Sequence, residues 1–383
     1  MRWRRVAWTL LPPLAACAVA RAVVVVVSTG PRFFSVDPIW WARWDSGNYV
    51  SIATEGYYWQ NCMERGTPEF GALCSNTTWY PGYPYLAKVA DWFGFPLATS
   101  AVFIAVTCWV ATVALLWVWF LRDRPRVTAL ACLTIAAFFP GVVYQQALFP
   151  ISMLTLLMVV TIHFALVRRW WWAAVAAGLA GFVYPIAIVL APALVLWVVL
   201  VRTELAWRAR LVVAAGVGLV ASVGTFAVFA IHQLEVDDWR ASISMQRYLG
   251  TKLMNPIESF WTVVVDRDSL LQTLDVRLKT PIATQTLLVA LLVLSIAACT
   301  AWGWRRAHEV GRDDAALLVL FVGIWLLPLA SFINTGLYRR EATLLPIVAL
   351  APRLPVWLSV PLAVACVGVA MRISPYFFNF ALN

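Results

Sequence analysis

The sequence predicts an all-α membrane protein whose chain crosses the bilayer many times. Hydrophobic residues make up 62% of its 383 residues, charged residues only 13%, and the mean hydropathy is +0.79. A soluble domain has about 25% charged residues. Apolar segments recur along the chain, and arginine-rich tracts follow every second one. These observations predict a polytopic helical bundle of about eleven membrane helices, with extracytoplasmic loops that contain short amphipathic helices.

The apolar segments follow one another from the N-terminus to the C-terminus. They span about 6–28, 97–121, 127–140, 150–167, 172–184, 186–201, 211–231, 283–302, 315–333, 343–352 and 355–372. The first follows a basic stretch and lacks a compelling cleavage site, so we expect a signal anchor that stays in the protein. Segments 172–184 and 343–352 are short for a membrane span, which takes about 20 residues.

Positive charge marks one end of these segments. The tracts contain Arg122, Arg124, Arg126, Arg168, Arg169, Arg202, Arg208, Arg210, Arg305, Arg306 and Arg312. Under the positive-inside rule every tract is cytoplasmic, and so is the N-terminus. The loops at 29–96 and 233–282 then face the outside, and the whole chain, 1–383, forms one transmembrane domain.

The formal net charge of +10 does not indicate a nucleic-acid partner. Lysine occurs only at Lys88, Lys252 and Lys279, and the arginines lie in short tracts between apolar runs rather than in one basic patch. The 22 tryptophans fit aromatic belts at the membrane interfaces. The arginine-rich, Ala/Val-rich composition is typical of high-GC coding, so we expect a bacterial plasma membrane.

The most informative polar segment is Arg43-Trp44-Asp45-Ser46-Gly47-Asn48-Tyr49, after the first span. A carboxylate among aromatic residues beside a membrane is costly to desolvate and marks a candidate for chemistry. Asp45 has two interpretations. It caps a helix over Gly47–Thr54 by accepting backbone N–H bonds, or it is a general base that takes a proton from an acceptor hydroxyl. Both can hold, because a capping carboxylate has a fixed direction.

Further motifs follow in a set order. Ile52-Ala53-x-Glu55-Gly56-Tyr57 and Tyr80-Pro81-Gly82-Tyr83-Pro84 come after Arg43-Trp44-Asp45-Ser46. Together they resemble the motifs of the PIG-V-like mannosyltransferases, membrane enzymes of the GT-C superfamily. Phe139-Pro140-Gly141 and Arg339-Arg340 are weaker similarities. The resemblance covers about 37–352, but only the first ninety residues contain specific motifs. Gln146-Ala147-Leu148-Phe149 and Tyr184-Pro185 depart from the family pattern.

The resemblance implies a GT-C-type helical bundle with Asp45 as the catalytic aspartate of an extracytoplasmic active site. It implies an inverting glycosyltransferase that moves mannose from polyprenyl-phosphate-mannose to a hydroxyl of an extracytoplasmic glycolipid, glycan or protein. Relatives that use monophosphate sugar donors generally need no metal, so we expect neither a metal nor a cofactor besides the lipid-linked donor. The sequence also lacks the His and Cys spacing of a zinc site.

Such a transfer needs a cation for the departing phosphate, and a guanidinium group suits phosphate oxygens. The candidates are Arg339, Arg340 and Lys252, with Arg240 and Arg247 as rivals. Arg339 and Arg340 have a second interpretation, which is snorkelling at the membrane interface or pairing with Glu341.

We expect further substrate contacts from the long loops. The candidates are Arg43, Trp44, Asn48, Glu55, Tyr80, Tyr83, Asp237 and Asp238. Plainer roles remain open for them: an ion pair for Glu55, solvated loop acids at 237–238, and packing for the tyrosines.

Cys62 and Cys74 share the first long loop, where the compartment is oxidising on this topology. We expect a disulfide between them, the alternative being two free thiols. Two other classes of protein compete with the enzyme. A transporter or lipid flippase would place ionisable groups near the midplane of the membrane and show repeats, although the break at Tyr184-Pro185 favours it mildly. A non-catalytic scaffold would present the outer loops to a partner enzyme.

Overall fold

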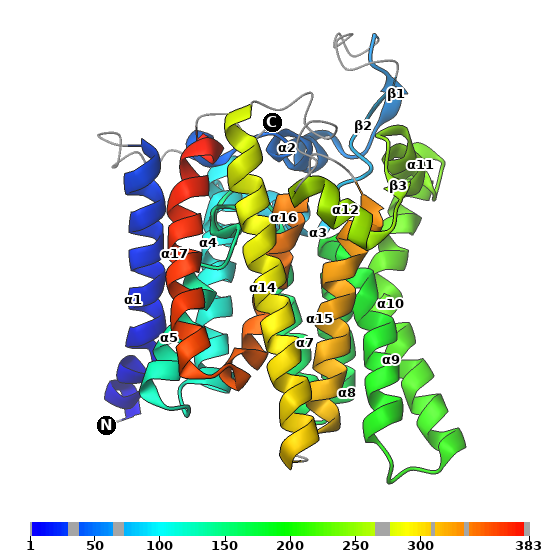
Figure 1. Ribbon diagram of the computed structural model, residues 1–383. Helices are drawn as coiled ribbons and strands as arrows, with labels where there is room; N and C mark the ends of the chain where they lie inside the picture. Colours follow the sequence, from blue (N-terminus) through cyan, green and yellow to red (C-terminus); the bar gives the residue numbers. More distant parts are fainter. Residues whose placement is uncertain are drawn as a thin grey trace.

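The chain forms a bundle of helices in the computed structural model, which describes residues 2–29, 38–63, 73–264, 276–307, 311–332 and 337–378 (Figure 1). The helices are α1 (Arg2–Thr29), α2 (Ser46–Glu55), α3 (Gly82–Trp92), α4 (Leu97–Leu116), α5 (Arg126–Ala137), α6 (Val142–Gln146), α7 (Ile151–Leu166), α8 (Trp170–Val183), α9 (Leu190–Val201), α10 (Trp207–Val236), α11 (Ala241–Tyr248), α12 (Pro256–Val264), α14 (Val276–Ala307), α15 (Arg312–Ala330), α16 (Leu337–Glu341) and α17 (Val356–Phe378).

Tighter or wider helical turns and short strands complete the described part. The turns are η2 (Pro38–Trp41), η4 (Trp117–Leu121), η5 (Pro185–Val189) and η6 (Ala342–Arg353). The strands form two antiparallel pairs, β1 (Trp59–Asn61) with β2 (Leu73–Ser75), and β3 (Lys252–Leu253) with β4 (Ser331–Phe332). Parts of both long loops, 30–37, 64–72 and 265–275, lie outside the described residues.

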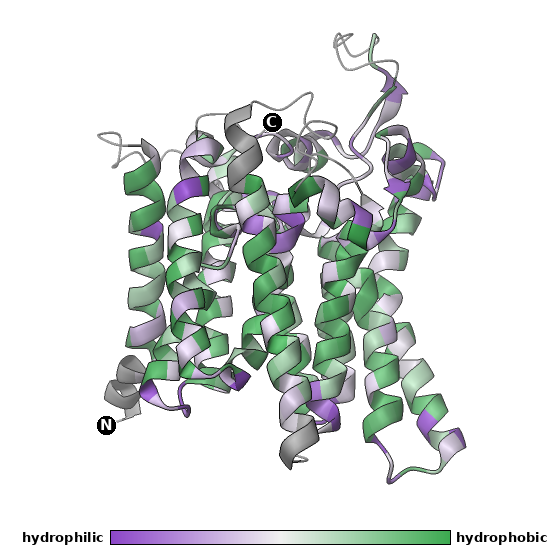
Figure 2. Ribbon diagram, viewed as in Figure 1, coloured by the Kyte–Doolittle hydropathy of each residue, from purple (hydrophilic) through white to green (hydrophobic). Residues whose placement is uncertain are grey.

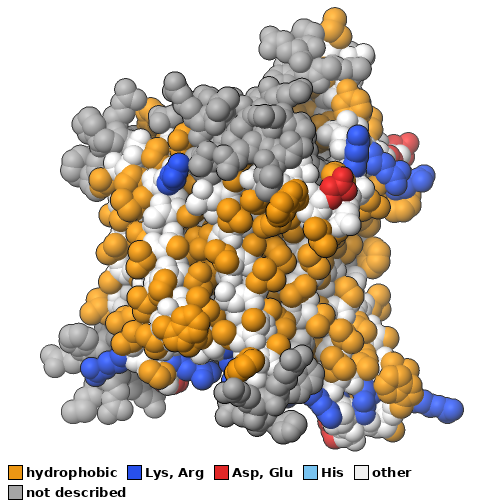
Figure 3. All heavy atoms as spheres, in the orientation of Figure 1, with side chains coloured by type: hydrophobic (Ala, Val, Ile, Leu, Met, Phe, Trp, Pro, Cys, Tyr) orange, Lys and Arg blue, Asp and Glu red, His pale blue; other side chains and the backbone are white. Residues whose placement is uncertain are grey.

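Within the described ranges, six helices are long and apolar enough to cross a membrane, which fits an integral membrane protein. They cover 9–28, 97–121, 207–236, 282–303, 312–330 and 356–378. Hydrophobic residues fill the middle of the bundle and hydrophilic ones gather toward its two ends (Figure 2). On the face shown in Figure 3, apolar side chains form a broad belt with Lys and Arg near its edges. The predicted all-α membrane fold is confirmed.

Every predicted apolar segment coincides with a helix, but several of these helices are short. Four shorter apolar helices cover 126–137, 151–166, 170–183 and 185–201, and η6 covers the predicted segment at 343–352. An α-helix rises about 1.5 Å per residue, so a helix of 12 to 17 residues is shorter than the roughly 30 Å of a bilayer core. The short helices pack against longer ones, but some of their apolar side chains stay exposed, among them Trp172, Leu179 and Leu196.

The arginine-rich tracts gather at one end of the bundle, here named the basic end (Arg122, Arg168, Arg202 and Arg312). Residues at the start of α15 form hydrogen bonds to two of the neighbouring segments. Asp313 accepts from Arg168, and Arg312 donates to the Leu200 carbonyl at 3.2 Å. The start of α1 and the α9–α10 connection lie at this same end (Figure 1). One-sided grouping of the arginines is what the positive-inside rule requires. The side chains of Arg305 and Arg306 lie outside the described residues.

Glycines bring α8 and α10 into close contact. A Cβ at Gly224 would lie 1.8 Å from the Gly178 carbonyl oxygen, and one at Gly178 would lie 2.8 Å from the Val220 carbonyl oxygen. Small residues let helix backbones approach each other, which is a common way for helices to pack in lipid. This contact holds α8 in place, and Tyr184 and Pro185 follow directly at its C-terminal end.

Candidate active site

Asp45 lies just before α2, in a turn whose neighbours are fixed. Trp44 adopts a φ of +45°, a conformation that costs energy in a non-glycine residue and persists only where the surroundings hold it. Its ring packs edge-on against Phe377 with the centroids 5.0 Å apart. On the other side, the Ser46 hydroxyl donates to the Leu148 carbonyl at 3.1 Å. These contacts fix the residues on both sides of Asp45 and therefore limit the directions that its carboxylate can take.

The Asp45 carboxylate does not cap α2, because it makes no side-chain hydrogen bond to the helix N-terminus. It pairs instead with the guanidinium of Arg339 in α16, 294 residues further along the chain. The Asp45 side chain remains 29% exposed and that of Arg339 16% exposed. The predicted helix is present as α2, but the capping role of the aspartate is wrong.

Arg339 is positioned by contacts between α6 and the start of η6. Gln145 donates from Nε2 to the Ala342 carbonyl at 2.8 Å, and its Oε1 accepts from the Thr155 hydroxyl at 3.2 Å. Gly141 begins α6 with a φ of +82°, and a Cβ there would lie 2.8 Å from the Ala342 Cβ. The glycine after Pro140 therefore permits the close approach that brings α16 to Asp45.

Arg340 has no carboxylate partner among the described residues. Its Nη1 donates to the carbonyl oxygen of Ser331 at 3.0 Å and lies 3.5 Å from the hydroxyl of the same residue. Glu341 points elsewhere, and its Oε2 accepts from Nε2 of Gln285 at 2.9 Å. Neither Arg339 nor Arg340 pairs with Glu341 in the described part, so the predicted alternative of pairing with Glu341 does not hold.

A cavity of about 440 Å³ adjoins these charged groups. Pockets of about 300–1,000 Å³ suit small ligands. Its charged and polar lining includes Asp45, Ser331, Arg339 and Arg340. Its apolar lining includes Ile186, Leu249, Leu327 and Pro328, from η5, the end of α11 and the end of α15. The cavity thus combines a charged wall with an apolar wall of the kind that a lipid-linked ligand needs.

The charges on the cavity wall do not balance. The lining contains one carboxylate and two guanidinium groups. Burial is the largest single influence on the pKa of Arg339 and lowers it. The Asp45 carboxylate and three nearby tyrosines together outweigh burial, so the pKa of this arginine is raised. Burial lowers the pKa of Arg340, and the positive charge of Arg339 acts in the same direction. An anionic ligand with several acceptor oxygens would neutralise the excess positive charge.

Other predicted residues of the first long loop lie outside the cavity lining. Those residues are Arg43, Trp44, Asn48, Glu55, Tyr80 and Tyr83. Tyr83 is fully buried and donates to the Ala101 carbonyl at 2.7 Å, and Tyr80 is also buried. Arg43 is 5% exposed, and its guanidinium lies 5.6 Å from the centre of the Trp40 ring. Glu55 is exposed at the end of α2.

The predicted residues of the second loop also lie outside the lining. Asp237 accepts from the Gln233 amide at 2.9 Å, and Asp238 accepts from the Arg240 backbone N–H at 2.8 Å. Lys252 is exposed in β3, which pairs with the β4 strand that contains Ser331. The structure therefore brings Asp45, Arg339 and Arg340 together and leaves Lys252 nearby but outside the wall.

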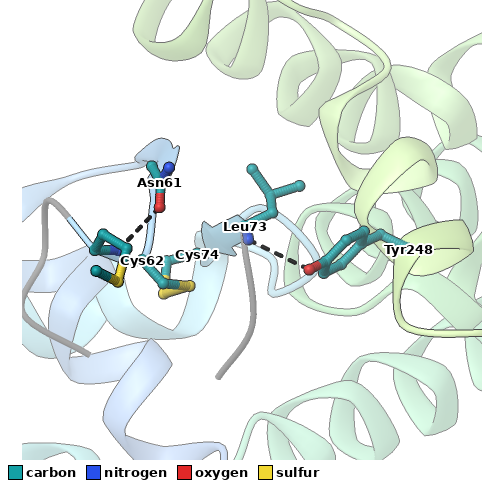
Figure 4. Close-up of a disulfide and its surroundings, with 6 residues drawn as sticks. Asn61, Cys62, Leu73, Cys74 and Tyr248 are labelled. Carbon is teal, nitrogen blue, oxygen red and sulfur yellow. Dashed lines mark hydrogen bonds between the residues drawn. A yellow bond between two sulfur atoms is a disulfide. The ribbon is translucent and has the colours of Figure 1, made fainter. Parts of the chain in front are cut away.

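The disulfide predicted between Cys62 and Cys74 is confirmed. It closes the β1–β2 hairpin, as Figure 4 shows. The Leu73 backbone N–H donates to the Tyr248 hydroxyl at 3.3 Å. Because Tyr248 belongs to α11, the hairpin contacts the helix whose Gln246 lines the cavity.

Several wall residues were not identified from the sequence. They are Tyr49, Thr78, Trp79, Tyr184, Gln246 and Ser331. Of these, Tyr184 was noted in the sequence only as part of a helix break. Tyr49 had a signal, because it follows Asp45 by four residues and therefore shares its helix face. No pattern in the sequence marked Thr78. Its loop is anchored by Asn76, which is fully buried and donates to the Gly56 carbonyl at 2.9 Å.

No group of three or more His, Cys, Asp or Glu side chains within the described ranges is arranged to hold a metal ion.

No protein-family model matches the chain, and no curated protein matches it. Among solved structures, the chain is similar to the Archaeoglobus fulgidus oligosaccharyltransferase, crystallised with Zn and sulfate, with a TM-score of 0.47 and 12% sequence identity. The match covers 94% of this chain and 53% of that protein, so the chain spans about half of its length. Similarity at this level does not assign the chain to a family.

Proposed function

We propose that the protein is a GT-C-type inverting glycosyltransferase. In this proposal it transfers mannose from polyprenyl-phosphate-mannose to a hydroxyl group of an extracytoplasmic glycolipid, glycan or protein. The supporting observation is a carboxylate beside two guanidinium groups on one cavity, at the end of a membrane bundle opposite the basic end. The motif resemblance around Asp45 supplies the sugar and the lipid carrier.

Each charged group has a role in this reaction. The donor phosphate binds Arg339 and Arg340, while its lipid tail extends along the apolar wall near Leu327. Asp45 takes the proton from the acceptor hydroxyl, whose oxygen attacks C1 of the sugar in line with the bond to phosphate. That C1–O bond breaks, and the phosphate leaves with the electron pair, stabilised by the two guanidinium groups.

The ion pair between Asp45 and Arg339 fits the state before the donor binds. Each group neutralises the other in the partly buried site. A donor phosphate competes with the carboxylate for Arg339, because both offer oxygen acceptors to the same guanidinium. Donor binding would then release Asp45 to act as a base. This order makes deprotonation of the acceptor depend on a bound donor.

A transfer assay tests the proposal. Purified protein is incubated with radiolabelled polyprenyl-phosphate-mannose and a membrane lipid extract, and labelled product is measured. Asp45→Asn should reduce transfer by at least about a hundredfold, since general bases contribute about 10²–10⁴. Asp123→Asn is the matched control, because Asp123 is 87% exposed at the basic end. Near-normal turnover in Asp45→Asn would refute the role of this residue.

The same assay separates the rival classes. A transporter or flippase would move the lipid across a vesicle membrane without forming a labelled product. A scaffold would show neither activity until its partner enzyme is added.

A further inference from the structure

The cavity beside Asp45 has a neutral part as well as a charged one. Tyr49 from α2, Thr78 from the loop before α3, Tyr184 from the α8–η5 break and Gln246 from α11 all line it. Their side chains offer hydroxyl or amide groups and no charge. Trp79 adds an aromatic ring to the same wall.

Tyr49 lies close to the proposed chemistry, and its ring is fixed. It follows Asp45 by one helical turn, which places the two side chains on one face. Its ring packs edge-on against Tyr83 at 5.9 Å and Phe149 at 6.1 Å between centroids. Tyr49 is also within electrostatic reach of Tyr184 and Arg339. The neutral groups therefore adjoin both the carboxylate and the phosphate side.

The hydrogen-bonding groups on this wall lack partners in the described part of the chain. The Thr78 hydroxyl is buried without a hydrogen bond there. The Tyr49 and Tyr184 hydroxyls and the Gln246 amide also form no side-chain hydrogen bond to a described residue. Buried polar groups in folded proteins are nearly always paired, with protein, water or ligand. A cavity lined by such groups suits a ligand that is rich in hydroxyls.

We propose that Tyr49, Thr78 and Tyr184 form the subsite that holds the neutral sugar ring of the donor and makes the enzyme specific for it. The inference rests on the proposed function. A hexose ring offers donors and acceptors that match two phenols and an alcohol, and the Trp79 ring can cover its C–H face. Among the described residues, the wall has no further charged side chain once the phosphate and the acceptor engage Arg339, Arg340 and Asp45. A uronic acid or amino sugar would therefore lack a counter-charge.

These three side chains then determine specificity for the sugar rather than affinity for the lipid phosphate. Removing one hydroxyl deletes one neutral hydrogen bond to the ligand, which corresponds to about a fivefold to tenfold loss in binding. The loss appears only when the ligand has a sugar. Arg340, in contrast, binds the phosphate, so its removal weakens the binding of any polyprenyl phosphate.

Binding measurements on the full-length protein in detergent test the subsite. Two ligands are compared, polyprenyl-phosphate-mannose and polyprenyl phosphate, using tryptophan fluorescence. The variants are Tyr49→Phe, Thr78→Val and Tyr184→Phe, with Tyr376→Phe as a matched control, since Tyr376 is half-buried in α17 and outside the cavity lining. Each of the three should bind polyprenyl-phosphate-mannose about fivefold to tenfold more weakly and polyprenyl phosphate unchanged.

Three results would overturn the inference in different ways. Unchanged binding of both lipids by all three variants would remove the subsite. Equal weakening for both lipids would assign these residues to the phosphate or to the fold. If the unaltered protein binds polyprenyl phosphate no better than uncharged polyprenol, the proposed function fails, and the subsite with it.

A second arm does not depend on variants that fold. The unaltered protein should bind a polyprenyl phosphate that bears glucuronic acid at least about tenfold more weakly than the one that bears mannose. Equal binding of the two would contradict an uncharged hexose subsite.

Discussion

Two arginine–aspartate pairs, at opposite ends of the bundle, show how the same interaction can serve different purposes. Asp45 and Arg339 meet beside the cavity, and Arg168 and Asp313 meet at the basic end. Both pairs join residues more than a hundred positions apart, with separations of 294 and 145. At the basic end the pair is bidentate, with distances of 2.7 and 2.8 Å, and Trp197 donates to the same carboxylate.

The two ends differ in charge balance. A second cavity of about 290 Å³ lies beside Arg168, and its other lining arginine, Arg202, pairs with Glu204 at 2.7 Å. Each lining arginine there has a carboxylate in the described structure. Beside Asp45, by contrast, Arg340 bonds only to Ser331 among the described residues. A paired set of charges braces helices, whereas an unbalanced set on a cavity wall indicates a binding site for an anion.

Removing the cavity arginines should have the largest effect. Arg339→Gln combined with Arg340→Gln removes both proposed phosphate ligands, and transfer should fall by at least about a hundredfold, since one lost transition-state donor costs about 10²–10³. The transfer assay with graded donor concentrations measures this. Arg168→Gln is the control and should keep its turnover per folded protein. Unchanged donor dependence in the double variant would move the phosphate site elsewhere.

A buried acid next to the cavity arginines should give stability a dependence on pH. Burial raises the pKa of Glu341 to about 7, while its bond from Gln285 lowers it less. As pH rises, the unfolded chain loses the Glu341 proton at a lower pH than the folded protein does. The free energy of unfolding should therefore fall as pH rises from the ordinary pKa of a glutamate to about 7. Glu341→Gln should flatten thermal-unfolding midpoints across that window. An identical pH profile in the variant would exclude Glu341 as the cause.

Weakening the Arg168–Asp313 ion pair at the basic end should affect stability more than catalysis. Asp313→Asn weakens the bonds from Arg168 and Trp197, and because the Arg168 side chain is 44% exposed, solvent screening limits the cost to about 1 kcal/mol. The midpoint of thermal unfolding should fall by a few degrees, and transfer at permissive temperature should persist. A loss of transfer without loss of stability would show that the basic end takes part in the reaction.

The smallest effect is expected at Lys252. This residue is exposed and outside the cavity lining, so Lys252→Met should change donor use by no more than about twofold, as is usual for exposed charges. Donor titration in the transfer assay gives the answer. A loss as large as that of the arginine variant would place the phosphate on the second loop.

Local patterns in the sequence predicted the fold well. Each apolar segment predicted from hydropathy coincides with a helix in the described chain, because a lipid-facing helix must be apolar over most of its length. The disulfide followed from two cysteines in one loop. Asp45, Arg339 and Arg340, which line the candidate site, were predicted from their chemistry and from the motif resemblance.

The arrangement of the site depends on contacts that no local pattern contains. The pairing of Asp45 with Arg339 requires α6 to dock against the start of η6, which depends on Gly141 and Gln145. Thr78 reaches the cavity only because the buried Asn76 holds its loop. Such residues are ordinary polar side chains in the sequence, and tertiary packing alone gives them a place on the wall.

The most direct measurement is an experimental structure of the full-length protein with polyprenyl phosphate bound. We expect a phosphate within hydrogen-bond distance, about 2.7–3.2 Å, of both the Arg339 and Arg340 guanidinium groups, with Asp45 released from Arg339 and facing the cavity. A phosphate bound at the basic end or beside Lys252, with the Asp45–Arg339 pair intact, would contradict it.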